Sequence, residues 1–172
     1  MRYRALFPLA AFLFSVLPLW AFQSSWQPKD KGLSFNDSHS STEWVQLVSP
    51  AGLSLRAGQA QNVTLQFQIK SGLHINSHTP HSPYLIPTSL TLDAPSGMRI
   101  AQPVYPQGTE YHFQFSPKEA LVVYTGEFAV NAAIKAAPGK YTVHGKLHYQ
   151  ACDNRMCNPP KTLLFAVPVT AR

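Results

Sequence analysis

The chain has 172 residues, with 14 Lys and Arg, 8 Asp and Glu and 7 His, and its formal net charge is +6 at pH 7 with His neutral. The basic residues are scattered, without a Lys/Arg block or an alternation of basic and aromatic residues, which argues against nucleic-acid binding. The sequence also lacks Gly-x-Ser-x-Gly, His-Glu-x-x-His and a phosphate-binding Gly-rich loop, so the common hydrolase classes are disfavoured.

The N-terminal segment has the pattern of an export signal. Arg2 and Arg4 precede an almost uncharged apolar run, Ala5–Trp20, which is followed by Ala21 and polar residues. This order is typical of a secretory signal peptide. Because the run is shorter than the ~20 residues that span a bilayer, we predict cleavage rather than a permanent anchor. Residues 1–21 are therefore predicted to be a signal peptide, and the mature chain to be exported.

Two regions follow the predicted signal. Residues 22–43 are rich in Ser, Asp, Lys and Gln and show few periodic apolar positions, which predicts a flexible leader. Residues 44–172 have a length that fits one domain. In that part no stretch keeps a helical period for three turns, and short apolar runs alternate with Pro and Gly. We predict a single all-β domain there.

Alternating apolar residues mark the strands of this domain. The clearest candidate is Gln61–Lys70, in which every second residue from Val63 to Ile69 is apolar, so one face should be buried. Six or more short strands at this spacing predict a β-sandwich or a barrel. The further candidates are Val45–Val48, Thr88–Leu92, Leu121–Asn131, Lys140–Tyr149 and Thr162–Val169.

The sequence contains two cysteines, Cys152 and Cys157, directly after the Lys140–Tyr149 strand. In an oxidising compartment a pair at this spacing should close into a disulfide. A structural disulfide is the commoner use in secreted domains, but a six-residue ring stabilises the fold by only about 2 kcal/mol. A redox pair, in contrast, needs both sulfurs close in sequence, so that the second can resolve a mixed disulfide. The spacing favours the redox use.

Histidines offer an alternative chemistry. His74, His78 and His81 could join the cysteines around zinc or copper. His78 and His81 lie in a Pro-rich loop without a carboxylate nearby in sequence, so we predict no metal site and no cofactor. The competing hypothesis is a non-catalytic sandwich that binds a partner protein or copper and contains a structural disulfide.

Several segments resemble a known family. The segments are Tyr149-Gln150-Ala151-Cys152, Cys157-Asn158-Pro159-Pro160-Lys161-Thr162, Gly72-Leu73-His74-Ile75-Asn76, Tyr84-Leu85-Ile86-Pro87-Thr88 and Tyr105-Pro106-Gln107-Gly108. With these segments the sequence resembles the N-terminal domain of the thiol:disulfide interchange protein DsbD, and they occur in the family's order over about residues 43–170.

The resemblance implies an immunoglobulin-like β-sandwich in the periplasm. Its cysteine pair would receive electrons from a membrane-embedded donor through a thioredoxin-like domain. The reduced pair would then reduce client disulfides, such as those of disulfide isomerases or of thioredoxin-like proteins of cytochrome c biogenesis. The protein would thus be a thiol-disulfide oxidoreductase of the protein-disulfide reductase type, and we expect it to act as a monomer.

The resemblance also assigns roles to residues. Cys157 would form the mixed disulfide with the partner and Cys152 would resolve it, which agrees with the polar loop before Cys157 and the core strand before Cys152. His74 and Asn76 would lie beside the pair, where each could hydrogen-bond a thiolate, although His74 could equally be a packed structural residue. Tyr149, Gln150 and Pro159 would line the site, and an aromatic residue of Thr109–Ser116 (Tyr111, Phe113 or Phe115) would cap it.

Overall fold

The computed structural model describes residues 43–113 and 116–172. The predicted signal peptide (residues 1–21) and nearly all of the predicted leader (residues 22–43) lie outside these ranges. These described ranges contain no helix that is long and apolar enough to cross a membrane. The ordered elements there are β-strands joined by turns and loops.

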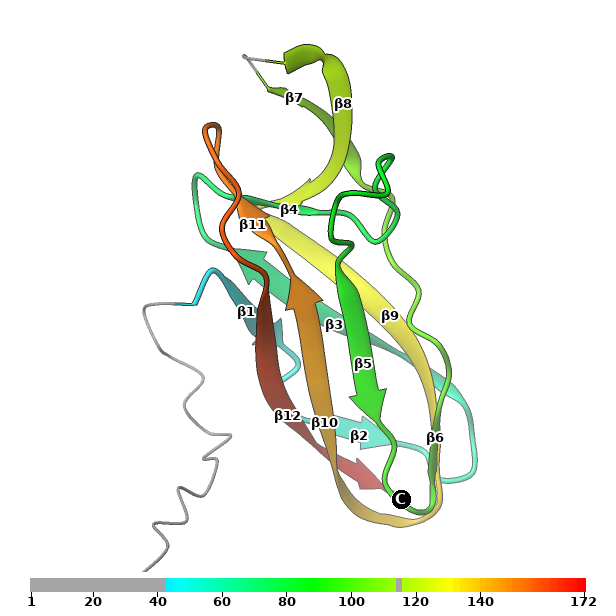
Figure 1. The fold of residues 1–172 in the computed structure, drawn as a ribbon. Helices are drawn as coiled ribbons and strands as arrows, with labels where there is room; N and C mark the ends of the chain where they lie inside the picture. The colour runs from blue at the N-terminus through cyan, green and yellow to red at the C-terminus, as the bar shows by residue number, and fades with distance from the viewer. Residues whose placement is uncertain (1–42, 114–115) are drawn as a thin grey trace, which may run out of the picture. The chain divides into compact units, whose positions relative to one another are not determined.

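Two four-stranded sheets pack face to face as an immunoglobulin-like β-sandwich (Figure 1). The predicted fold class is therefore confirmed. The first sheet has the order β1-β3-β9-β6, with bounds β1 (Val45–Ser49), β3 (Gln61–Ile69), β9 (Glu127–Ala136) and β6 (Met98–Ile100). The second has the order β2-β12-β10-β5, with bounds β2 (Leu53–Leu55), β12 (Lys161–Ala171), β10 (Gly139–Tyr149) and β5 (Ser89–Asp93).

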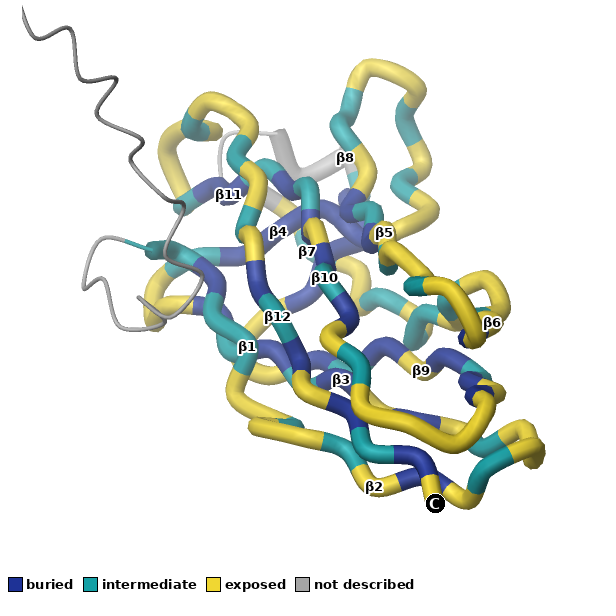
Figure 2. The backbone as a smooth tube through the Cα atoms, turned by 90° about the horizontal axis from the view of Figure 1, so that it is seen from below, coloured by how far each residue is buried: buried dark blue, intermediate teal, exposed yellow. Residues whose placement is uncertain are grey.

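Buried residues alternate with less buried ones along the strands of both sheets (Figure 2), and the buried residues form the core between the sheets. Phe67 on β3 stacks on Phe128 with ring centroids 5.2 Å apart and meets the edge of Phe165 on β12 at 5.7 Å. The ring of Phe165 lies so close to Gly145 that a Cβ there would come within 2.1 Å of it. Glycine at this position of β10 is thus required by the packing of an aromatic ring against the backbone.

A third sheet forms one end of the domain and carries Cys152. Its order is β11-β4-β8-β7, with bounds β11 (Ala151–Cys152), β4 (His74–Asn76), β8 (Ser116–Thr125) and β7 (Thr109–Phe113). Strand β10 continues through Gln150 into β11, so the core sheet leads directly to Cys152 (Figure 1). The hairpin of β7 and β8 rises from this end of the sandwich.

Most of the predicted strands are confirmed to within a few residues. The strands Val45–Val48, Gln61–Lys70, Thr88–Leu92, Lys140–Tyr149 and Thr162–Val169 correspond to β1, β3, β5, β10 and β12.

The prediction of one strand at Leu121–Asn131 is wrong. The segment divides into β8 and β9 at Gly126, whose φ of 60° lies in the left-handed region that glycine adopts without strain. The carbonyl of Gly126 accepts a hydrogen bond from Ile69 N at 2.7 Å. The turn sends β8 into the third sheet and β9 into the first.

Candidate redox site

Cys152 and Cys157 are joined by a disulfide, as predicted from their spacing, with Cα atoms 4.0 Å apart. The two residues differ in exposure. Cys152 lies on β11 and has 0% exposed surface, whereas Cys157 follows the loop of residues 153–156 and is exposed. A partner thiolate can therefore approach Cys157 from solvent, while Cys152 stays behind it.

The loop between the cysteines is held by its own first residue. The carboxylate of Asp153 accepts hydrogen bonds from Arg155 N at 2.7 Å and from Met156 N at 2.8 Å. These backbone donors, that of Arg155 first, hold the pKa of Asp153 below its usual value. Asp153 is thus an anion at neutral pH and fixes the turn that presents Cys157.

The chain after Cys157 is tied back to the strand before Cys152. Asn158 N donates to the carbonyl of Ala151 at 2.9 Å, and Gln150 Nε2 donates to the carbonyl of Asn158 at 3.1 Å. Pro159 follows on the exposed surface. Gln150 and Pro159, both predicted to line the site, therefore lie at the base of the cysteine loop.

His74 is the residue of β4 that lies opposite Cys152 in the register of β11. Its side chain is only 3% exposed, and its ring centroid is 4.7 Å from that of Tyr111. Burial lowers the pKa of His74, and the nearby charge of Asp153 opposes this shift without cancelling it. The imidazole is thus neutral at neutral pH. The register places His74 opposite one of the two cysteines, and its role beside the pair stays a prediction.

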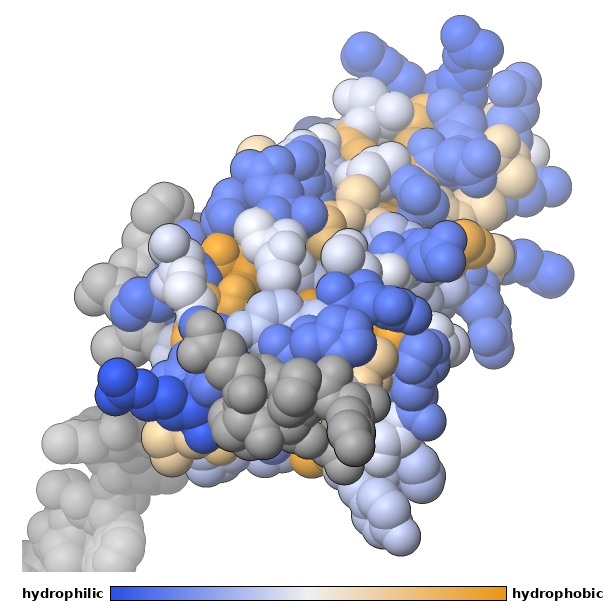
Figure 3. Space-filling view, turned by 90° about the horizontal axis from the view of Figure 1, so that it is seen from above, coloured by the Kyte–Doolittle hydropathy of each residue, from blue (hydrophilic) through white to orange (hydrophobic). Residues whose placement is uncertain are grey.

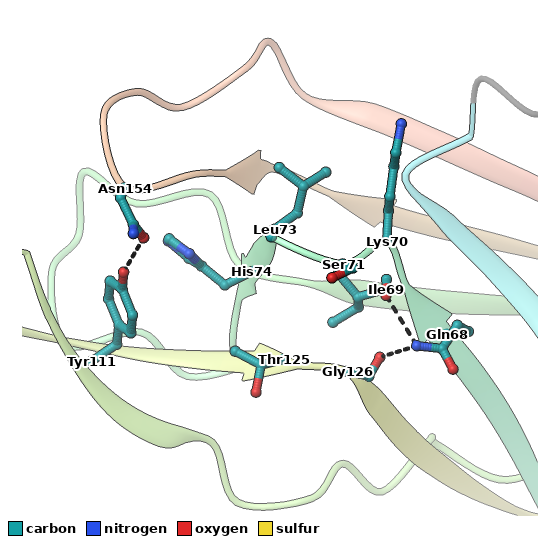
Figure 4. A pocket seen from close by; sticks show the side chains of 11 residues that line it. Gln68, Ile69, Lys70, Ser71, Leu73, His74, Tyr111, Thr125, Gly126 and Asn154 are labelled. Atoms are coloured by element: carbon teal, nitrogen blue, oxygen red, sulfur yellow. Dashed lines mark hydrogen bonds between the residues drawn. The ribbon is translucent and has the colours of Figure 1, made fainter.

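Tyr111 connects the β7–β8 hairpin to the cysteine loop, because its hydroxyl donates a hydrogen bond to Asn154 Oδ1 (Figure 4). Of the three aromatic residues predicted as candidates for the cap, Tyr111 is the one whose side chain the structure describes. Phe115 and the side chain of Phe113 lie outside the described part of the chain. The choice among the three candidates stays a prediction.

A pocket of 580 Å³ opens beside the cysteine loop. His74, Tyr111 and Asn154 form one side of it, and the imidazole points toward the other two (Figure 4). The end of the domain that carries the site presents mostly polar side chains with small apolar patches between them (Figure 3). Met156, next to Cys157, is one exposed apolar residue, with 62% of its surface accessible.

Asn76 and Tyr149, the other two residues predicted to line the site, have no exposed surface. Asn76 is fully buried, and its Nδ2 donates to the carbonyl of Ile86 at 3.0 Å, which holds the loop after β4. Tyr149 is fully buried in the core, and this burial raises its pKa to about 12. The predicted place of Asn76 and Tyr149 in the site lining stays a prediction.

Sequence reasoning missed Asp153 and Asn154. An Asp-Asn pair is a common turn signal, because both side chains hydrogen-bond backbone groups of the next residues.

The alternative hypothesis of a metal site involved His74, His78 and His81. His78 stacks on Tyr105 with ring centroids 3.7 Å apart. Residues 43–113 and 116–172 contain no group of three or more His, Cys, Asp or Glu that could hold a metal ion.

Comparison with known proteins identifies the family. The family model of the N-terminal region of the thiol:disulfide interchange protein DsbD matches residues 44–168. The chain belongs to this family. No curated protein matches the chain.

Among solved structures, the chain is similar to the reduced DsbD N-terminal domain of Neisseria meningitidis, with 22% identity over 66% of this chain and 82% of that one and a TM-score of 0.45. It is also similar to the N-terminal periplasmic domain of ScsB from Proteus mirabilis (12% identity, 72% of this chain, 44% of that one, TM-score 0.44). A third structure is the complex between the DsbD and PilB N-terminal domains of Neisseria meningitidis (20% identity, 64% and 77% covered, TM-score 0.41).

If the disulfide serves chemistry rather than folding, the domain will fold without it. We expect the Cys152→Ala/Cys157→Ala variant to unfold cooperatively in urea and to lose about 2 kcal/mol, the value for a six-residue ring. The wild type with its disulfide reduced is the matched control, since it lacks the staple but keeps both side chains. A double variant without a cooperative transition would show that the disulfide is structural.

The contact of Tyr111 with the cysteine loop should slow access to the disulfide. We expect Tyr111→Phe, which loses the hydrogen bond to Asn154, to be reduced by dithiothreitol about fivefold faster, the equivalent of ~1 kcal/mol. Tyr111→Ala should be faster still, as followed by alkylation of the released thiols. Tyr141→Ala is the control, because the Tyr141 hydroxyl bonds Ala137 O, away from the cysteine loop. Equal rates for all variants would exclude Tyr111 as the cap.

Proposed function

We propose that this chain is a thiol-disulfide interchange module of the periplasm. Its Cys152–Cys157 pair accepts two electrons from a membrane-linked thioredoxin-like donor and passes them to disulfides of periplasmic client proteins. The observation that carries the proposal is the unequal exposure of the two sulfur-bearing residues, in a domain of the DsbD N-terminal family. A disulfide used only as a staple has no need of one accessible end.

The difference in exposure supports separate roles for the cysteines. Thiol-disulfide exchange proceeds by attack of a thiolate on one sulfur, and access decides which sulfur is used. Cys157 forms the mixed disulfide with the partner, since it is the exposed member of the pair. Cys152 then attacks Cys157 from within the domain and releases the partner.

The fixed loop supports a fast second step. With the turn held by Asp153 and the base of the loop held by Asn158, the two cysteines stay within bonding range of each other. Holding two reacting groups in place converts a bimolecular step into an intramolecular one. The mixed disulfide is therefore resolved by Cys152 before another thiol attacks it.

The same family membership supports the proposed place and partners. The pattern at residues 1–21 supports export, and the family description names thiol:disulfide interchange. A donor in the membrane and a thioredoxin-like partner are what the resemblance of the cysteine segment implies. The end of the sandwich that carries the cysteines presents mostly polar side chains with small apolar patches (Figure 3). Such a surface fits transient docking better than a permanent interface.

Trapping of a mixed disulfide tests this function. We expect the Cys152→Ser variant to form a stable covalent complex with a thioredoxin whose resolving cysteine has been replaced and whose remaining cysteine is activated as a mixed disulfide with nitrothiobenzoate, because Cys157 displaces the nitrothiobenzoate and nothing resolves the product. The matched variant, Cys157→Ser, should trap at least about tenfold less, since buried Cys152 is screened from the partner. The complexes are quantified on non-reducing gels. Equal trapping would remove the assignment of roles, and absence of trapping by both variants would contradict the interchange function.

A further inference from the structure

In the reduced protein, burial of Cys152 hinders the loss of its thiol proton. The thiolate, not the thiol, is the attacking form in disulfide exchange. A thiol at a position with 0% exposed surface ionises reluctantly, because burial disfavours the charged form. The resolving step therefore needs a neighbouring group that takes the proton from Cys152.

His74 is the residue placed for this task. It lies directly opposite Cys152 in the antiparallel pairing of β4 and β11. Residues opposite each other in such a pair project from the same face of the sheet, with Cβ atoms about 5 Å apart. His74 is itself only 3% exposed, so little water lies between the imidazole and the groups packed against it.

The charged and titratable groups around His74 suit a base. Asp153, in the loop after β11, is the anion that acts on the imidazole. Tyr111, on β7, packs against the ring. Lys70 lines the same pocket, but its side chain points away from the imidazole (Figure 4). The pKa of His74 is lowered by burial, which keeps the ring able to accept a proton at neutral pH.

We propose that His74 is the general base that removes the proton from Cys152 when the mixed disulfide at Cys157 is resolved. This inference rests on the proposed function. Asp153 stabilises the imidazolium that forms, and Tyr111 positions the ring. A cysteine activated by a histidine that is assisted by a carboxylate is a known arrangement for producing a thiolate.

The step balances in atoms and electrons. The Cys152 S–H bond breaks, and the proton moves to an imidazole nitrogen of His74. The Cys152 thiolate attacks the Cys157 sulfur, so the Cys152–Cys157 bond forms and the bond from Cys157 to the partner sulfur breaks. The partner sulfur leaves with the electron pair as a thiolate. The cysteine pair is oxidised by two electrons and the partner is reduced, and the proton of His74 passes to water through the adjoining pocket.

A two-phase reaction isolates this step. When the reduced full-length chain reacts with dithiobis-nitrobenzoate, attack by Cys157 releases one coloured nitrothiobenzoate in a phase whose rate depends on reagent concentration. Attack by Cys152 on the resulting mixed disulfide releases a second in a phase that is independent of the reagent concentration. Stopped-flow absorbance separates the two phases.

We expect His74→Gln to slow the second phase about 100-fold at pH 7 and to leave the first phase unchanged, as for loss of a general base. His78→Gln is the matched control, because His78 also stacks on a tyrosine but is not paired with a cysteine. Its two phases should equal those of the wild type.

The Asp153→Asn variant tests the inference without altering the buried ring. It keeps an oxygen for the turn but removes the charge, so it should slow the second phase severalfold.

The pH profile and chemical rescue distinguish a base from a packing residue. In the wild type the second phase should fall as the pH drops through the pKa of His74, since the imidazolium cannot accept a proton. In His74→Gln the second phase should rise with pH and approach the wild-type rate once Cys152 ionises unaided. Added imidazole should accelerate the second phase of His74→Ala, because the base can enter through the pocket.

The outcomes separate the two proposals. A wild type that releases one nitrothiobenzoate instead of two would overturn the interchange function and this inference with it. A normal second phase in His74→Gln would overturn the role of His74 alone. The role of His74 would also be overturned if both phases slowed equally, or if imidazole failed to accelerate His74→Ala.

Discussion

The pairing of the two-residue strand β11 with β4 places Cys152 inside the domain and leaves Cys157 at its surface. The pairing is firm because β11 continues β10, whose Leu147 and Tyr149 are fully buried between the sheets. Only after Cys152 does the chain leave the sheet, and Asn158 then returns it to the carbonyl of Ala151. The unequal exposure of the two cysteines is thus a consequence of the fold and does not depend on the disulfide alone.

The polar groups around the pair form a connected set. Asp153 holds the turn through two backbone donors, and its charge acts on His74. Asn154 accepts the hydroxyl of Tyr111, which packs on the same histidine. The loop that presents Cys157 and the ring of His74 are therefore stabilised by the same few contacts. A change in the loop on docking of a partner would reach His74 through Tyr111 and Asp153.

The sequence alone predicted the parts of the fold that depend on local periodicity. The alternation from Val63 to Ile69 reports burial of one strand face, so β3 could be located closely. The turn at Gly126 was missed, because one glycine between two apolar runs leaves the alternation almost intact. The short strands β4 and β11 carry no period of their own and exist through long-range pairing. The cysteines could be found from the sequence because they lie close together in it. The contact of Asn154 with Tyr111 could not, because the two residues are 43 positions apart.

Reversible reduction of the pair is the property on which the whole account depends. It is measured by equilibrating the full-length chain in dithiol redox buffers, quenching, and counting the alkylated cysteines by mass. We expect both thiols to appear together in a single two-electron transition with a reduction potential above about −300 mV, the range of exchangeable disulfides. A disulfide that stays oxidised to potentials below about −300 mV would be a structural staple and would contradict the account.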